Sequence, residues 1–250
     1  KSPQQMVGGV TKSWFAQKLG VAPEKIFCVS IMPWVAKKAE CELPTMRTET
    51  GPDVDLVLTT REFVRMIRAD KLNPLELPEE ELDSPLGAYT GAGAIFGATG
   101  GVMEAALRTA AYLVNGENPD PDAFAAVRTG PGLREAEYEL GGSKIRCAVV
   151  SGLGNARKLI QDLKAGRAKY DFVEVMACPG GCVGGGGQPV SVEDEELYGV
   201  RGERLYDIDR ACQLRFSHEN PEIQQLYREF LGKPLGQLSE ELLHTDHKAW

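Results

Sequence analysis

The sequence predicts an α/β fold with largely parallel, twisted sheets that are flanked by helices and divided between two lobes. Short apolar segments rich in β-branched residues alternate with amphipathic helical segments along the 250 residues, as in sheets whose strands are joined by crossover helices. Most of these apolar segments lack the alternation of a half-exposed strand, so we expect both sheet faces to be covered. A proline- and acid-rich segment, residues 73–84, predicts a boundary between the lobes near residues 73–85.

The first predicted lobe contains an N-terminal helix and two strand-helix units. Ser2 and Gln5 fit a capping box at the start of a helix that Gly20 ends. The later elements expected in this lobe are a buried strand at residues 26–32, a helical segment at residues 35–42, a buried strand at residues 54–59 and an amphipathic helix at residues 61–69.

The second predicted lobe repeats the alternation of strands and helices. Its expected elements are a glycine-rich loop at residues 85–101, a helix at residues 102–115, a short edge hairpin around Gly141 and Gly142, a strand at residues 144–151, a helix that ends at Gly166, a buried strand at residues 170–176 and helices from Tyr206 onward. In parallel sheets, ligands bind beyond the carboxyl ends of the strands. Two unusual loops, residues 33–37 and 177–189, follow strands in this way, so we expect them to face one site.

Composition and charge argue against several classes of protein. The 28 basic and 36 acidic residues give a net charge of −8, and the basic residues are scattered, so no nucleic-acid partner is expected. The most apolar stretch, residues 105–114, is too short to span a bilayer. The N-terminus lacks the pattern of a secretory signal, and the six cysteines are too dispersed for a disulfide framework. We therefore expect a cytoplasmic protein, or a periplasmic one that is exported with a partner.

Cys178 and Cys182 are the side chains most suited to bind a metal cluster. They lie four residues apart in the motif CPGGC, just before four consecutive glycines. Thiolates are the usual ligands of iron-sulfur clusters, and glycines let the backbone approach a bound group closely. In a helical continuation both thiols would point the same way, so both are expected to ligate one cluster. The alternatives are two buried cysteines in a glycine-rich turn, or a zinc site, although none of the three histidines lies at ligand spacing.

Two motifs resemble the FeFe-hydrogenases, also called iron-only hydrogenases. The segment MACPGGCVGGGGQP is similar to the last of their three signature motifs, and IMPWVAKKAE resembles their middle signature, MPCxxKxxE. The segments at residues 1–6 and 93–108 and the final helical region also resemble this family, so the resemblance covers essentially all 250 residues. It points to the C-terminal part of the catalytic domain of the large subunit, whose first signature, TSCCPxW, would precede Lys1.

The resemblance implies the fold of the iron-only hydrogenase catalytic domain and a six-iron cofactor, the H-cluster. In this family a 4Fe-4S cluster is held by four cysteines, one of which bridges to a di-iron unit that carries CO, cyanide and a dithiolate. The implied activity is that of an oxidoreductase of anaerobic metabolism, the reversible reduction of protons to dihydrogen. The implied partners are a ferredoxin or an iron-sulfur redox subunit for electron transfer, and a companion chain that supplies the first signature.

The resemblance also assigns roles to individual residues. Cys178 is implied as a metal ligand in the 4Fe-4S cluster, and Cys182 as the ligand that also bridges to the di-iron unit. Lys37 is implied to hydrogen-bond a cyanide, and Glu40 belongs to the same signature. The remaining implied site residues are Met32 and Met176, which with Lys37 and Cys182 form the catalytic set, and the cofactor-binding residues Ser2, Pro3, Gln4, Pro33, Phe96, Gly97, Gly181 and Gln188.

Trp34 departs from the family pattern. It stands where the middle signature has a ligating cysteine, and an indole side chain cannot ligate iron. The chain as given therefore supplies two of the four cysteine ligands, and we expect it to be inactive alone. Three explanations stay open: another segment or chain completes the site, the chain is a relative with a structural, sensory or iron-sulfur-carrying role, or Cys28 or Cys41 substitutes as a ligand.

Overall fold

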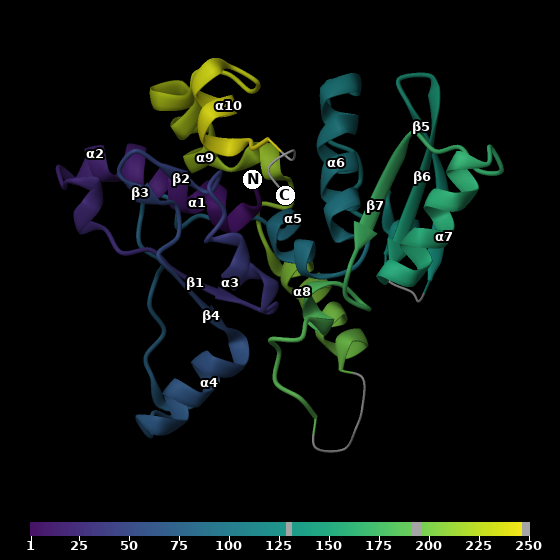
Figure 1. The fold of residues 1–250 in the computed structure, drawn as a ribbon. Helices are drawn as coiled ribbons and strands as arrows, with labels where there is room; N and C mark the ends of the chain where they lie inside the picture. Colours follow the sequence, from purple (N-terminus) through teal and green to yellow (C-terminus); the bar gives the residue numbers. More distant parts are fainter. Residues whose placement is uncertain (129–131, 192–196, 247–250) are drawn as a thin grey trace. The chain divides into compact units, whose positions relative to one another are not determined.

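The computed structural model describes residues 1–128, 132–191 and 197–246 (Figure 1). The chain divides into two compact units. The first comprises Lys1–Ala88, Gly187–Pro189 and the described residues from Pro221 onward, and the second comprises Tyr89–Gly186 and the described residues of Val190–Asn220. Each unit combines helices with a sheet, so the predicted α/β class is confirmed.

The first unit begins with a helix that Gly20 ends, as predicted. Helix α1 (Pro3–Val10) continues through a π-helical turn (Thr11–Phe15) into α2 (Ala16–Leu19), and Gly20 follows with a φ of 63°. The predicted capping box is wrong, because the hydroxyl of Ser2 makes no cap hydrogen bond and instead donates to the carboxylate of Glu40. The Ser2 hydroxyl therefore bonds to Glu40, which is distant in the sequence, and does not cap the helix.

A pair of parallel strands forms the central sheet of the first unit. Strand β1 (Val29–Met32) pairs with β4 (Leu56–Thr59), and Met32 lies opposite Thr59 at the carboxyl ends. The predicted burial of the first strand is wrong, because the side chains of Val29 and Ile31 are 50% and 43% exposed. Two further short strands, β2 (Arg47–Thr48) and β3 (Gly51–Pro52), pair with each other in an antiparallel ribbon.

Helices follow both central strands of the first unit. Helix α3 (Ala36–Glu40) comes after β1, and α4 (Thr60–Ala69) comes after β4. Thr59 and Glu62 form a complete capping box at the start of α4. The C-terminal helices α9 (Pro221–Leu226) and α10 (Gln237–Leu243) contribute to a small core with the N-terminal helix, which contains Val10, Trp14, Leu226, Leu231 and Leu242.

The second unit has a three-stranded sheet in the order β5-β6-β7. Strands β5 (Leu133–Leu140) and β6 (Ser143–Ser151) form an antiparallel hairpin that turns at the two glycines predicted for it, whereas β7 (Phe172–Met176) runs parallel to β6. The sheet is therefore mixed, and its hairpin is longer than the short edge hairpin predicted.

Helices cover both faces of this sheet. Helix α6 (Gly101–Asn115) packs Met103 and Leu107 against Cys147 and Val149 of β6. Helix α7 (Leu153–Lys164) packs Leu159 against Val150, whose side chain points to the opposite face because successive residues of a strand alternate. The other helices of this unit are α5 (Gly91–Ala94) and α8 (Tyr198–Ala211), the second of which starts eight residues before the predicted position.

No helix in the described parts of the chain is both long enough and apolar enough to cross a membrane.

Candidate functional site

The two candidate cluster ligands of the second unit lie in a short loop that follows β7. Met176 ends β7, and Cys178 and Cys182 come next, both with half-buried side chains. The loop turns at Gly180 and Gly181, whose φ angles of 76° and 92° favour glycine. The predicted helical continuation between the thiols is therefore wrong, although the chain still keeps both thiols within one tight loop.

Backbone hydrogen bonds fix the loop around each cysteine. The N–H of Gly181 donates to the carbonyl of Cys178 at 3.0 Å, and the N–H of Gly185 donates to the carbonyl of Cys182 at 2.9 Å. The hydroxyl of Ser151, at the end of β6, accepts a hydrogen bond from the N–H of Gly180 at 3.1 Å. The loop thus has a defined conformation that connects to the end of the neighbouring strand.

The glycines of this loop are required by close packing against protein. A Cβ atom on Gly181 would lie 2.7 Å from the backbone nitrogen of Thr99, and one on Gly180 would lie 2.5 Å from the ring of Tyr198. Gly186, in contrast, has open space around it. The sequence predicts that these glycines give room to a bound group, and at Gly180 and Gly181 the structure shows a different reason, which is close contact with protein atoms.

Three other predicted residues of the second unit lie at this loop. Gly181 packs against Gly97 and Ala98, and the N–H of Thr99 donates to the carbonyl of Gly180 at 3.0 Å. Phe96 precedes Gly97 in the 3-10 turn Ile95–Gly97. The carbonyl of Met176 accepts a hydrogen bond from the N–H of Gly152 at 2.8 Å. Phe96, Gly97 and Met176 therefore belong to the segments that adjoin the cysteine loop.

The first unit gathers a second set of predicted residues. The ammonium of Lys37 forms an ion pair with Glu40, and the hydroxyl of Ser2 donates to the other oxygen of the same carboxylate. The amide of Gln4 donates to the carbonyl of Lys37 at 3.4 Å and accepts a hydrogen bond from the hydroxyl of Ser30 at 2.8 Å. Since an ammonium has three N–H donors, Lys37 can still donate to an anionic ligand while Glu40 holds it.

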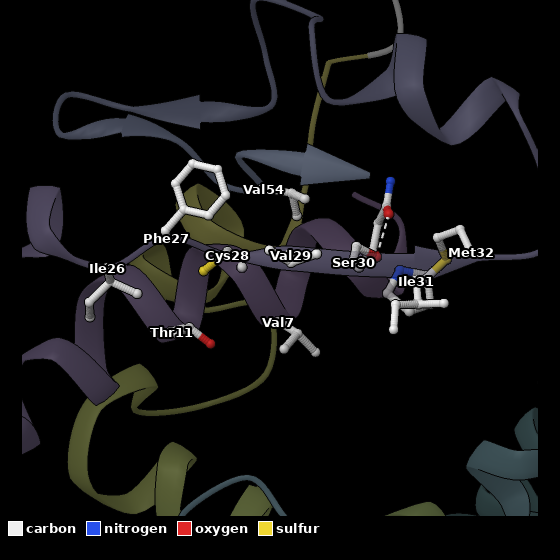
Figure 2. Close-up of a pocket in the computed structure, with 13 residues that line it drawn as sticks. Val7, Thr11, Ile26, Phe27, Cys28, Val29, Ser30, Ile31, Met32 and Val54 are labelled. Atoms are coloured by element: carbon white, nitrogen blue, oxygen red, sulfur yellow. Dashed lines mark hydrogen bonds between the residues drawn. The ribbon is translucent and has the colours of Figure 1, made fainter. Parts of the chain in front are cut away.

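A cavity of about 530 Å³ adjoins this set of residues. It is lined by α1, by residues 26–32 and by Val54, and most of the lining is apolar (Figure 2). Pro3, Gln4 and Met32 are the predicted site residues that contribute to it. The structure therefore brings residues of the opening segment and of the middle motif into one place.

The end of the glycine-rich motif belongs to the first unit. The N–H of Gly187 donates to the carbonyl of Pro33 at 2.8 Å, and its carbonyl accepts from the N–H of Arg61 at 2.9 Å. The carbonyl of Gln188 accepts from the guanidinium of Arg61 at 3.3 Å. Pro33 and Gln188, far apart in the sequence, are therefore held beside each other by the backbone.

Trp34 and the two alternative cysteines also lie in the first unit. Trp34 is 37% exposed, and its carbonyl accepts the N–H of Lys37 at the start of α3. Burial raises the pKa of the thiols of Cys28 and Cys41, which disfavours the thiolate that iron requires. Among the described residues, no group of three or more His, Cys, Asp or Glu side chains is placed to hold a metal ion.

A buried ion network in the second unit was missed by the sequence reasoning. Arg108 pairs with Glu104 at 2.7 Å and with Asp209 at 2.9 Å, and all three side chains are almost fully buried. Burial opposes the ionisation of Asp209, but hydrogen bonds from Arg108 and Arg215 outweigh it and lower the pKa of the carboxyl. The only local signal was the spacing of Glu104 and Arg108 on one helix face.

Comparison with known proteins identifies the family. The family model described as the C-terminal domain of the iron-only hydrogenase large subunit matches residues 1–186. A second model, the iron hydrogenase small subunit, matches residues 195–250. The chain belongs to the iron-only hydrogenase family, as the motifs indicated, and the sequence reasoning did not foresee that its last part matches a small-subunit model.

Individual relatives include hydrogenases and an iron-sulfur assembly protein. The NADP-reducing hydrogenase subunit HndD of Solidesulfovibrio fructosivorans is 48% identical over 99% of this chain and 42% of its own length. The cytosolic iron-sulfur assembly component 3 of Mus musculus is 35% identical over 100% of this chain and 53% of its own length. The chain therefore spans about half the length of these relatives.

Solved structures of the same family share the fold. The apo FeFe-hydrogenase HydA1 from Chlamydomonas reinhardtii superposes with a TM-score of 0.82 and 41% identity, covering 98% of this chain and 68% of that chain. At this level of identity the likeness extends to the sequence as well as to the arrangement of helices and strands.

Proposed function

We propose that the chain is the C-terminal part of an FeFe-hydrogenase catalytic domain and contributes ligands to the cluster at which protons are reversibly reduced to dihydrogen. The observation that carries the proposal is the loop of Cys178 and Cys182, which the backbone holds in one conformation at the carboxyl end of a parallel strand. This position is where parallel sheets place their ligands. Electrons would come from a ferredoxin or an iron-sulfur redox subunit.

The donor set fits half of the implied 4Fe-4S site. Two thiols on one loop suit iron, because thiolates are its usual ligands in such clusters. Trp34 does not fit a ligand position, and its indole offers only an N–H donor. The other two thiolates would therefore come from outside these 250 residues or would be absent. When bound, the six-iron cofactor would supply the electrons and, in its di-iron unit, the iron at which protons are reduced.

The roles proposed for the protein's own groups are binding and orientation. Cys178 and Cys182 bind iron, and the hydroxyl of Ser151 orients their loop through the N–H of Gly180. Lys37, held by Glu40, donates an N–H to an anionic ligand such as cyanide. The sulfur-containing side chains of Met32 and Met176 provide a soft, apolar surrounding that excludes water.

A second candidate function is a relative without hydrogenase activity that carries or helps to assemble iron-sulfur clusters. It is favoured by Trp34 in place of a cluster cysteine and by the relationship with the iron-sulfur assembly component of Mus musculus. The two candidates differ in the di-iron unit, which only the hydrogenase requires. Three expectations stay predictions. They are the identity of the redox partner, the existence of a companion chain, and the location in the cytoplasm or the periplasm.

The proposal is tested by anaerobic reconstitution with iron, sulfide and an excess of a small thiol that can occupy open ligand positions. We expect the parent chain to bind iron and sulfide, and the Cys182→Ser and Cys178→Ser variants to lose most of both. Cys212→Ser is the matched control, because Cys212 follows α8 in the same unit and has no proposed ligand role. Equal iron in all four proteins would remove the assignment.

A further inference from the structure

We propose that Glu174 is a positioning residue that fixes the cysteine loop by holding the start of helix α6. The inference rests on the proposed function, since the loop it positions is the proposed iron-binding loop. Glu174 lies in the middle of β7, four residues before Cys178, and only 8% of it is exposed. A carboxylate at this depth needs hydrogen-bond partners, because burying an unpaired charge is costly.

The partners of Glu174 are two backbone amides at the N-terminus of α6. One carboxylate oxygen accepts the N–H of Gly100 at 2.6 Å, and the other accepts the N–H of Met103 at 2.7 Å. The first N–H groups of a helix have no partner within the helix. Gly100, the N-cap, has no side chain to provide one, so a carboxylate from another element performs the capping.

The loop before α6 connects this cap to the cysteines. Thr99 immediately precedes Gly100, and its N–H donates to the carbonyl of Gly180 at 3.0 Å. Gly181 packs so closely on Gly97, Ala98 and Thr99 that a side chain there would overlap with them. The contacts form a closed ring. It runs from Glu174 of β7 to the start of α6, then through residues 97–99 to the cysteine loop, and this loop continues directly from β7.

The ring explains why a carboxylate is required in place of another polar group. Burial raises the pKa of the Glu174 carboxyl, and the two hydrogen bonds that its oxygens accept and the positive end of the helix dipole act against this to favour the charged form. Glutamine has nearly the same shape, but its amide has one acceptor oxygen and an NH₂ donor. In a Glu174→Gln variant, that donor would face a backbone N–H and one of the two contacts would be lost.

The experiment compares the parent chain, Glu174→Gln and Leu159→Ala. Leu159 is buried on the other side of the sheet, in a cluster with Val150 and Ala156, so its truncation lowers stability without touching the ring. Amide hydrogen exchange is measured on each chain, and bound iron, sulfide and the EPR spectrum of the reduced cluster are measured after anaerobic reconstitution.

We expect Glu174→Gln to accelerate exchange by about tenfold at the amides of Thr99, Gly100 and Gly180, the effect of losing one hydrogen bond. We also expect it to lower bound iron at least twofold and to change the EPR spectrum, whereas Leu159→Ala leaves the spectrum as in the parent. Parent-like exchange and an unchanged spectrum in Glu174→Gln, or the same changes in Leu159→Ala, would overturn the inference.

The test still decides the role of Glu174 if the parent chain binds no iron or if Glu174→Gln does not fold. If the parent chain binds no iron, the proposed function fails, and exchange at Thr99 and Gly180 still decides whether Glu174 positions the loop. If Glu174→Gln does not fold, Glu174→Asp keeps the charge but is too short to reach both amides. Its exchange at Thr99 and Gly180 should then exceed that of the parent, and parent-like protection there would contradict the role.

Discussion

Replacing Gly181 with alanine should destabilise the second unit and displace the cysteine loop. Gly181 has φ 92° and ψ −156°, a region that residues with a Cβ atom almost never occupy. Backbone strain of this kind costs about 1–3 kcal/mol. The new Cβ would also lie 2.7 Å from the nitrogen of Thr99, and overpacking of this kind costs a further ~1–3 kcal/mol.

The expected loss of unfolding free energy is therefore roughly 2–6 kcal/mol, a large part of the ~5–15 kcal/mol of a typical domain. Gly186→Ala is the matched control, because a Cβ there meets nothing within 4 Å. Any gain from a stiffer unfolded chain is common to both variants. Urea denaturation monitored by circular dichroism measures the difference, and a Gly181→Ala variant as stable as Gly186→Ala would refute the reasoning.

Further predictions concern the buried network, the acid range and position 34. Arg108→Met removes the buried cation that Glu104 and Asp209 share, so that Glu104 keeps only Arg128 and Asp209 only Arg215, and it should lower the unfolding free energy by about 3–5 kcal/mol. Lys144→Met, in an exposed pair, should cost less than about 1 kcal/mol by urea denaturation. Hydrogen bonds from Arg215 and Arg128 lower the pKa of Asp122 to about 2, so its contribution is present above the ordinary pKa of 3.8 and is lost as the pH falls toward 2. Asp122→Asn should therefore flatten the decline of the urea midpoint between these two pH values, and an equally steep decline would contradict this. Trp34→Cys, co-expressed with a segment that carries the first signature, should raise iron per chain, and unchanged iron would count against a vacated ligand position.

The sequence predicted the order of strands and helices well where local signals decide the structure. Gly20 ended a helix because its left-handed conformation suits a helix end, and the hairpin turned at Gly141 and Gly142. Thr59 and Glu62 carry a capping-box spacing that could have been recognised, and the structure forms it. The capping box predicted from Ser2 and Gln5 does not form, because Glu40 accepts the hydrogen bond of the Ser2 hydroxyl. Glu40 is too distant in the sequence for a local pattern to reveal this contact.

The remaining errors have their cause in tertiary contacts. Residues 26–32 are apolar enough for a buried strand, but burial depends on what packs against them, and the described residues leave Val29 half exposed. The two glycines between Cys178 and Cys182 exclude the helix that the spacing suggested, since both have positive φ. The motif alone predicts the roles of Lys37 and Glu40. The hydrogen bonds from Gln4 to Lys37 and from Ser30 to Gln4 can be seen only in the folded structure.

The most direct test is infrared spectroscopy of the chain assembled anaerobically with the segment that carries the first signature. We expect absorption bands of iron-bound CO and cyanide in the assembled protein with Cys at position 34, and their disappearance in the Cys182→Ser variant. A protein that binds iron and sulfide but never shows these bands would contradict the hydrogenase assignment and favour the iron-sulfur-carrying relative.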